Sequence, residues 1–260
     1  LILFGKLPNA EQLDTFTGLL ADCRTLPKNF TEDMIIKTPS PNIMNKLARS
    51  VLALYPFDEN PEDNSLENML RQSVELIARI PIIAAQAYQV SRHYYAHDSM
   101  YLHIPPRELS TAECLLYCIR PNKKYTDEEA KLLDLCLMLH AEHGGGNNSA
   151  FVGRVMSSSG TDTYSAISAA IGSLKGPLHG GANKQVCDML SDIEKNVSDW
   201  KDDEEVAAYL AKIIRKEAGD RSGKIYGMGH AVYTLSDPRA VILKKCARKL
   251  AKERGFIDRF

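Results

Sequence analysis

Apolar residues recur at intervals of three and four positions along most of the chain, which is the spacing of one face of an α-helix. The longest such stretches are residues 65–79 and 82–95, and Pro81 separates them into two expected helices. Other prolines fall between the periodic stretches and indicate joints: Pro39, Pro41, Pro56, Pro61, Pro105 and Pro106. Almost no stretch alternates apolar and polar residues as a strand does, so the pattern predicts an all-α fold.

Three helix starts carry a capping box, in which an N-cap side chain and a Glu or Gln three residues later bond to each other's backbone amides. The pairs are Asn9 with Gln12, Ser110 with Glu113, and Thr126 with Glu129. Asp237 followed by Pro238 predicts the start of the last helix, because proline suits the first helical turn. Another helix is expected to begin near Ala182.

A glycine-rich break near residue 176 divides the chain into two expected domains. Before it, residues 161–174 are rich in Ser, Ala and Gly, which suits a helix that others cross closely inside a bundle. After it, the acidic residues 198–210 indicate a solvated surface with a helix following. We therefore expect residues 1–176 to form a segment of a large helical domain and residues 177–260 to form part of a smaller helical domain.

The charge balance and the cysteines limit the classes of partner. Thirty-two Lys and Arg residues face 33 Asp and Glu residues among 260, so no strong field favours nucleic acid or a membrane surface. No apolar run reaches membrane-spanning length. The six cysteines are scattered without a CxxC pair, which predicts reduced thiols in a cytoplasmic protein.

Histidines at the end of the helix that opens at Thr126 are the first candidates for chemistry. His140 and His143 continue its apolar face before three glycines. They are either core histidines with satisfied hydrogen bonds or, for His143, a cation that meets an anionic ligand at a helix C-terminus. A metal-dependent hydrolase with these two as ligands is disfavoured, because HAEH lacks the HExxH spacing and a third ligand. We expect no metal.

The segment GPLHGGAN, residues 176–183, encloses His179 between a proline and three glycines. Glycine permits close backbone approach, and the positive end of the following helix disfavours a cationic imidazole. His179 would then be a neutral donor to a developing oxyanion. A tight interhelical turn in which His179 caps a neighbouring helix is the alternative.

The segment GMGHAVYTLSDPR, residues 227–239, places His230 after closely spaced glycines and Arg239 in the first turn of the last helix. The helix dipole opposes a cation at that position. A ligand carboxylate or phosphate would compensate for this, and so would an acidic side chain of the protein itself.

HAEHGGGN, GPLHGGAN and GMGHAVYTLSDPR, in this order, resemble the citrate synthase family over nearly the whole chain. The resemblance implies an all-α fold with a large and a small domain that close over the substrates. It also implies a homodimer that condenses acetyl-CoA with oxaloacetate through citryl-CoA to citrate and CoA, in the tricarboxylic acid cycle. No cofactor is implied, because the CoA thioester is a substrate.

The same resemblance implies roles for single residues. His179 would stabilise the enol of acetyl-CoA, and His230 would polarise the carbonyl of oxaloacetate. Four further residues belong to the substrate-binding site: His143 and Arg239 would hold oxaloacetate, and Asn147 and Ser149 would lie behind them, with Ser149 positioning His179. The backbone around Ile225, Gly227, Met228 and Gly229 would line the adenine site of CoA. His143, His179, His230 and Arg239 are therefore expected to converge on one cleft.

Some of the family's features are not found here. The aspartate base and further oxaloacetate-binding arginines are expected beyond Phe260, so we expect a segment truncated at both ends and inactive on its own. Thr234 stands where the family pattern has a basic residue near the CoA phosphates; Lys224 is a substitute or simply a solvated lysine. A 2-methylcitrate synthase that takes propionyl-CoA, a citryl-CoA lyase-type homologue and a non-catalytic regulatory or binding homologue remain alternatives.

Overall fold

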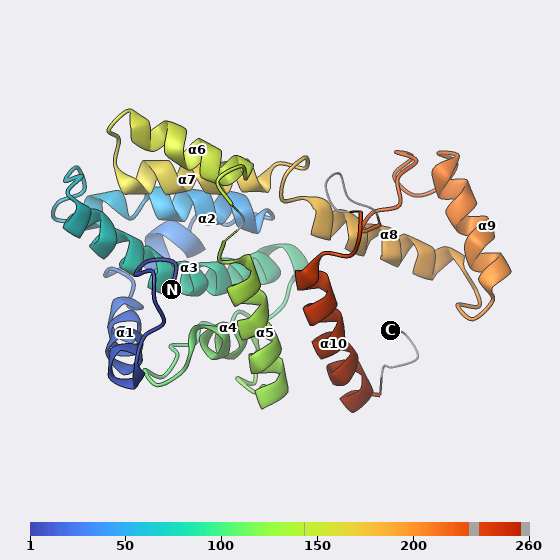
Figure 1. Ribbon diagram of the computed structural model, residues 1–260, viewed down its shortest axis with the longest axis horizontal. Coiled ribbons are helices and arrows are strands. Elements are labelled where there is room, and N and C mark those ends of the chain that lie inside the picture. Colours follow the sequence, from blue (N-terminus) through green and yellow to red (C-terminus); the bar gives the residue numbers. More distant parts are fainter. Residues whose placement is uncertain (143, 229–233, 256–260) are drawn as a thin grey trace. The chain divides into compact units, whose positions relative to one another are not determined.

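The computed structural model describes residues 1–142, 144–228 and 234–255, and these ranges contain helices and no strand (Figure 1). The all-α prediction is confirmed. Packing contacts divide the chain into two compact units: the first comprises residues 1–172 and the stretch from Pro238 on, and the second comprises Ser173–Asp237. The expected domains, residues 1–176 and 177–260, stay a prediction.

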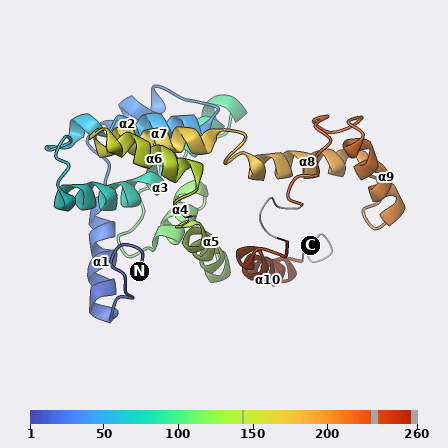
Figure 2. The same ribbon diagram turned by 45° about the horizontal axis from the view of Figure 1, so that its top comes forward.

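The first unit is built around one long helix. Its helices are α1 (Ala10–Cys23), α2 (Ile43–Leu52), α3 (Leu66–Ala96), α4 (Thr111–Ile119), α5 (Asp127–His140), α6 (Asn148–Ser158), α7 (Thr163–Lys175, whose last three residues belong to the second unit) and α10 (Pro238–Glu253), with a π-helical turn at Thr31–Ile36 and a 3-10 turn at Tyr55–Phe57. Helix α3 contacts α1, α2 and α4. Figure 2 shows it between a layer of α2, α6 and α7 and a layer of α1, α4 and α5, as Figure 1 does.

Local start signals are confirmed at several helices. All three predicted capping boxes are present, at Asn9 before α1, Ser110 before α4 and Thr126 before α5. Pro238 is the first residue of α10, and the helix α8 (Ala182–Asn196) begins at Ala182 as expected. These starts depend on residues within one turn of each other, which is why the sequence reveals them.

The expected break at Pro81 is wrong, because α3 continues through it for 31 residues. Proline has no backbone N–H, so the carbonyl of Ile77 loses one helical hydrogen bond. Ile77 lies on an exposed face, where water can replace that bond. Leu76 and Ile83, on either side of the proline, pack into the same buried cluster, so tertiary packing holds the two halves together.

The main core of the first unit joins the π-helical turn, α2, α3 and α7. Its buried members are Phe30, Ile35, Leu47, Val51, Leu54, Leu76, Ile83, Ala87, Val90 and Tyr164. Tyr164 is the buried member from α7, and its hydroxyl must find a partner there because a buried polar group is costly when unpaired.

The partner of Tyr164 is the carboxylate of Asp58, whose side chain is 1% exposed. Its Oδ2 accepts from the Tyr164 hydroxyl at 2.7 Å and from Gln72 Nε2 at 2.9 Å, and its Oδ1 accepts from Arg71 Nη2 at 2.6 Å. Thr163 Oγ1 donates to Gln72 Oε1 at 2.5 Å and extends the network along α7. The start of α7 is thereby tied to α3 and to the loop before it.

The last helix is held against α5 within the first unit. Arg254, just after α10, places Nη2 2.6 Å from Oε1 of Glu129 in the first turn of α5. Arg120 also binds Glu129, with 2.8 Å between Nη1 and Oε2. The hydrogen bond from Arg120 lowers the pKa of Glu129 to about 2, so this carboxylate remains ionised at neutral pH.

Replacing Asp58 by alanine is expected to lower the free energy of unfolding by about 1–3 kcal/mol, because Tyr164, Gln72 and Arg71 would lose their shared acceptor. Urea unfolding measures this. Asp33→Ala is the control, because Asp33 forms an exposed ion pair with Lys37 and should change stability by less than about 1 kcal/mol. Equal losses in both variants would contradict the importance of the Asp58 network.

The stability of the protein should also depend on the ionisation of Asp58. Burial raises the pKa of Asp58, but its hydrogen bonds outweigh that effect and lower the pKa from 3.8 to about 2. Because the folded state favours the ionised carboxylate, this contribution is complete above pH 3.8 and is lost as pH falls towards about 2. Urea unfolding across that range should show a smaller pH dependence in Asp58→Asn than in the unmodified chain.

Candidate functional site

Residues 145–150 are held in place by side chains at the start of α6 and on α6 itself. Asn147 is the N-cap of α6, and its Oδ1 accepts from the backbone N–H of Ser149 at 2.8 Å and of Ala150 at 3.2 Å. Arg154 Nη2 donates to the carbonyl of Gly145 at 2.6 Å and holds that glycine against the same helix. The structure thus brings Asn147 and Ser149 together in the first unit, while His143 lies outside the described residues.

His179 lies in a tight turn immediately before α8 (Ala182–Asn196), as predicted. Its backbone N–H donates to the carbonyl of Gly176 at 3.0 Å, and the imidazole is half-buried. A Cβ added at Gly180 would lie 2.2 Å from the carbonyl oxygen of Leu174. A Cβ added at Gly181 would lie 2.8 Å from Pro177 Cα, so both positions require glycine for close backbone approach.

The start of α8 leaves its first backbone amides available. Gly181 is the N-cap and has no side chain to accept a hydrogen bond from them. Amides at a helix start, together with the helix dipole, stabilise a negative charge that approaches them. His179 is two residues from this cap in the sequence and belongs to the same unit.

The segment from Ile225 to Met228 packs on α8 and α9 (Asp203–Ile214) of the second unit. Ile225 lies against the buried cluster of Ile193, Val197 and Ile213. Gly227 has a φ of +82°, and a Cβ there would lie 3.1 Å from Val186 Cγ2 on α8. Met228 is 77% exposed. The structure therefore places His179 just before α8 and this segment against α8 and α9 of the same unit, while Gly229 and His230 lie outside the described residues.

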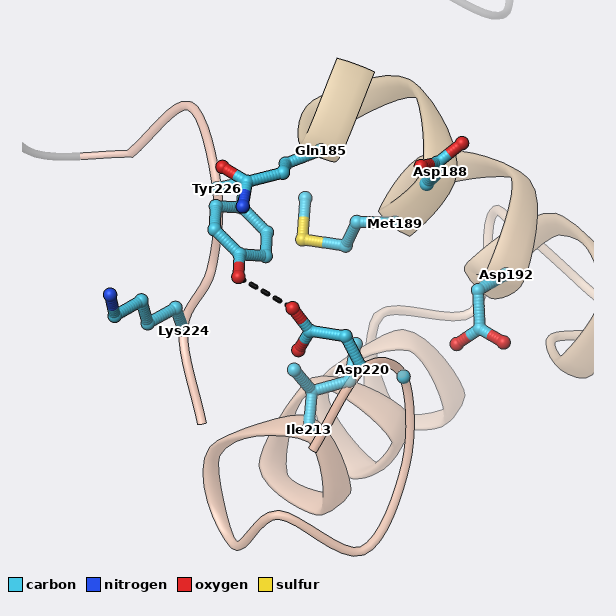
Figure 3. A pocket seen from close by; sticks show the side chains of 9 residues that line it. Gln185, Asp188, Met189, Asp192, Ile213, Asp220, Lys224 and Tyr226 are labelled. Atoms are coloured by element: carbon cyan, nitrogen blue, oxygen red, sulfur yellow. Dashed lines mark hydrogen bonds between the residues drawn. The ribbon is translucent and has the colours of Figure 1, made fainter. Parts of the chain in front are cut away.

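A pocket of about 250 Å³ lies within the second unit (Figure 3). One face of α8 and the loop after α9 line it, with Gln185, Asp188, Met189 and Asp192 from the helix and Asp220, Lys224 and Tyr226 from the loop. The hydroxyl of Tyr226 donates to Asp220 Oδ2 at 2.5 Å. Sequence reasoning missed Asp220 and Tyr226; the only signal was the pair of glycines at Gly219 and Gly223 beside them.

Arg239 is the second residue of α10 and belongs to the first unit, with Asn147 and Ser149. His179, Ile225, Gly227 and Met228 belong to the second unit. The convergence of His143, His179, His230 and Arg239 on one cleft stays a prediction.

Other candidates can be placed individually. His140 Nδ1 bonds to the carbonyl of Cys136 at 2.6 Å, one turn earlier on α5. Within residues 1–142, 144–228 and 234–255, no group of three or more His, Cys, Asp or Glu side chains is arranged to hold a metal ion. All six cysteines are free thiols. Of the helices that the structure describes, none has the length and apolar character needed to cross a membrane.

Replacing Gly180 by alanine should lower the free energy of unfolding by about 1–3 kcal/mol, because the new Cβ would collide with the Leu174 carbonyl. Gly172→Ala is the control: Gly172 lies in α7 with nothing within 4 Å of a built Cβ. That change should stabilise the helix by about 0.5–1 kcal/mol. Urea unfolding compares the two, and a neutral Gly180→Ala would show that the turn tolerates a side chain.

Comparison with known proteins extends over nearly the whole chain. The model of the family described as citrate synthase, C-terminal domain, matches residues 1–259. Citrate synthase of Deinococcus radiodurans is 34% identical, with 98% of this chain and 62% of the relative covered, and that of Acidithiobacillus ferridurans is 36% identical, with 96% and 61% covered. A 2-methylcitrate synthase of Shewanella oneidensis is 32% identical, with 98% and 62% covered.

Solved structures agree. Citrate synthase from Pyrobaculum aerophilum superimposes with a TM-score of 0.77 at 28% identity, covering 98% of this chain and 60% of that one. Citrate synthase from Thermotoga maritima superimposes with a TM-score of 0.72 at 27% identity, covering 95% of this chain and 59% of that one. The chain spans about 60% of the length of the relatives it matches. Since the family model and these relatives cover almost every residue, the chain belongs to the citrate synthase family.

Proposed function

We propose that this chain carries part of the active site of an enzyme that condenses acetyl-CoA with oxaloacetate, through citryl-CoA, to give citrate and CoA. The observation that supports it most is the turn at residues 176–181, where two glycines pressed against backbone hold His179 just before α8. Membership of the citrate synthase family gives that histidine its proposed role.

The chemistry suits a donor fixed in this position. Removal of a proton from the acetyl methyl group puts negative charge on the thioester oxygen, and a hydrogen-bond donor that is already in place stabilises that charge without rearrangement. His179 would donate to this oxygen, and the start of α8 would add the favourable field of its dipole. A general base must take the methyl proton on the other side, and none of the described residues is assigned to that role.

The remaining assignments belong to the same proposal. Arg239 and His143 would bind the carboxylates of oxaloacetate, and His230 would polarise its keto carbonyl so that the enol carbon can attack. Asn147, through its cap on α6, would fix the position of Ser149. Ile225, Gly227, Met228 and Gly229 would line the adenine site of CoA.

A second candidate is 2-methylcitrate synthesis from propionyl-CoA, which the match to the Shewanella oneidensis protein supports. One additional methylene changes binding in an apolar pocket by only about 1–3 kcal/mol, so pocket shape decides between the two acyl groups. We also infer a homodimer that works in the cytoplasm, in the tricarboxylic acid cycle. Light scattering of the purified protein tests the dimer.

The complete gene product should release free CoA only when acetyl-CoA and oxaloacetate are both present. A thiol-reactive dye follows the release, and a reaction without oxaloacetate corrects for the protein's own cysteines, such as the exposed Cys187. Propionyl-CoA in parallel separates the two candidates by their kcat/KM ratio. Absence of release with either thioester would contradict the proposed function.

His179→Ala should lower kcat by about 100- to 1,000-fold with little change in the KM for oxaloacetate, because its hydrogen bond acts on charge that develops in the transition state. Arg239→Ala should instead raise the KM for oxaloacetate by about 10- to 100-fold, since it would bind charge already present in the ground state. Lys245→Ala, exposed on the same helix, is the control. Equal effects of both variants on both constants would contradict this division of roles.

A further inference from the structure

The loop that follows α9 holds an unusual number of residues in the left-handed region of backbone conformation. Between positions 216 and 227, five residues have positive φ: Lys216, Gly219, Arg221, Gly223 and Gly227. Two of them, Lys216 and Arg221, are not glycine, and such residues hold this conformation only where surrounding contacts enforce it. The contacts of this loop must therefore be strong enough to maintain its path.

Two of those contacts press the backbone of the loop onto the helices. A Cβ at Gly223 would lie 3.0 Å from the carbonyl oxygen of Ile214 at the end of α9, and one at Gly227 would lie 3.1 Å from Val186 on α8. Between them, Ile225 is fixed by the buried apolar cluster of α8 and α9. The segment is thus supported from both helices of the second unit.

A further contact is a ring of hydrogen bonds that Tyr226 closes. Its hydroxyl donates to Asp220 Oδ2 at 2.5 Å and lies 3.1 Å from Ser222 Oγ, and the Ser222 backbone N–H donates to Asp220 Oδ1 at 2.9 Å. The hydrogen bond from Tyr226 lowers the pKa of Asp220 below its usual value, so the acceptor is ionised at neutral pH. A bond between a hydroxyl and a carboxylate is stronger than one between neutral groups.

We propose that Tyr226 is a positioning residue for the CoA thioester: by bonding to Asp220, it holds the segment from Ile225 to Met228 in the shape that receives the ligand. This inference rests on the proposed function. Ile225 is turned into the apolar cluster and Tyr226 into the pocket (Figure 3), whereas Met228 is 77% exposed. The two inward side chains fix the segment, and its backbone and Met228 remain for the ligand.

Tyr226→Phe removes only the hydroxyl, and it is the variant that tests this role in the complete gene product. It should raise the KM for acetyl-CoA by about two- to tenfold, the range of one net hydrogen bond, while kcat and the KM for oxaloacetate stay unchanged. Amide hydrogen exchange at residues 219–228 should become faster by a similar factor, because the loop opens more often. Asp220→Asn, which keeps one carbonyl acceptor in place of a carboxylate, should change both readouts in the same direction.

Tyr209→Phe is the matched control, because Tyr209 makes the same kind of bond in the same unit. Its hydroxyl donates to Asp192 Oδ2 at 2.7 Å, so this bond joins α9 to α8 and not to the segment at Ile225–Met228. This variant should lower the melting temperature without changing the KM for acetyl-CoA. A purely structural role for Tyr226 would make the two tyrosine variants behave alike.

The outcomes separate this inference from the proposed function. If the unmodified protein releases CoA normally and Tyr226→Phe loosens the loop with an unchanged KM for acetyl-CoA, the positioning role is overturned and the proposed function stands. If kcat and both KM values change together, Tyr226 maintains the fold and not the ligand site. If the unmodified protein neither binds CoA nor releases it from either thioester, the proposed function fails, and the role of Tyr226 fails with it.

Discussion

The buried carboxylate of Asp58 determines how α7 lies against α3 in the first unit. A charge removed from water is tolerated only when its oxygens are bonded, so the partners of Asp58 must come to it. Arg71 and Gln72 reach it from α3, and Tyr164 reaches it from α7. The apolar cluster around Tyr164 closes over this arrangement. The start of α7, the helix that precedes the turn of His179 in the sequence, is therefore held in place against α3.

Local sequence signals predicted where several helices begin. The features that depend on contacts between distant residues could not be predicted from the sequence. Each capping box depends on two side chains three positions apart, so the starts at Asn9, Ser110 and Thr126 can be found without a fold. The break predicted at Pro81 is wrong for the opposite reason. The sequence shows that the proline removes one helical hydrogen bond, but it does not show that α3 packs against three other helices. Asp58 and Tyr164 are 106 positions apart, and no pattern connects them.

Within the candidate site, the sequence predicts the close backbone contacts that only glycine allows. Gly180 and Gly181 indicate close backbone approach from the sequence alone, and the distances to Leu174 and Pro177 confirm it. The bond between Tyr226 and Asp220 could not be foreseen in this way. The spacing of an aspartate and a tyrosine six residues later predicts no bond by itself, and the backbone turns at Gly219 and Gly223 bring the two side chains together.

The two segments that meet around α8 are held by different forces, and this difference matches what each must do. A backbone contact such as that of Gly180 has no second arrangement, so it suits a donor that must stand in place before charge develops on the substrate. A hydrogen bond such as that of Tyr226 can break and form again, so it suits a segment that must admit and release a ligand. Loss of the first kind of restraint acts on the chemical step, and loss of the second acts on affinity. Helix α8 supports both segments: it begins directly after the turn of His179, and Val186 in its second helical turn lies against Gly227.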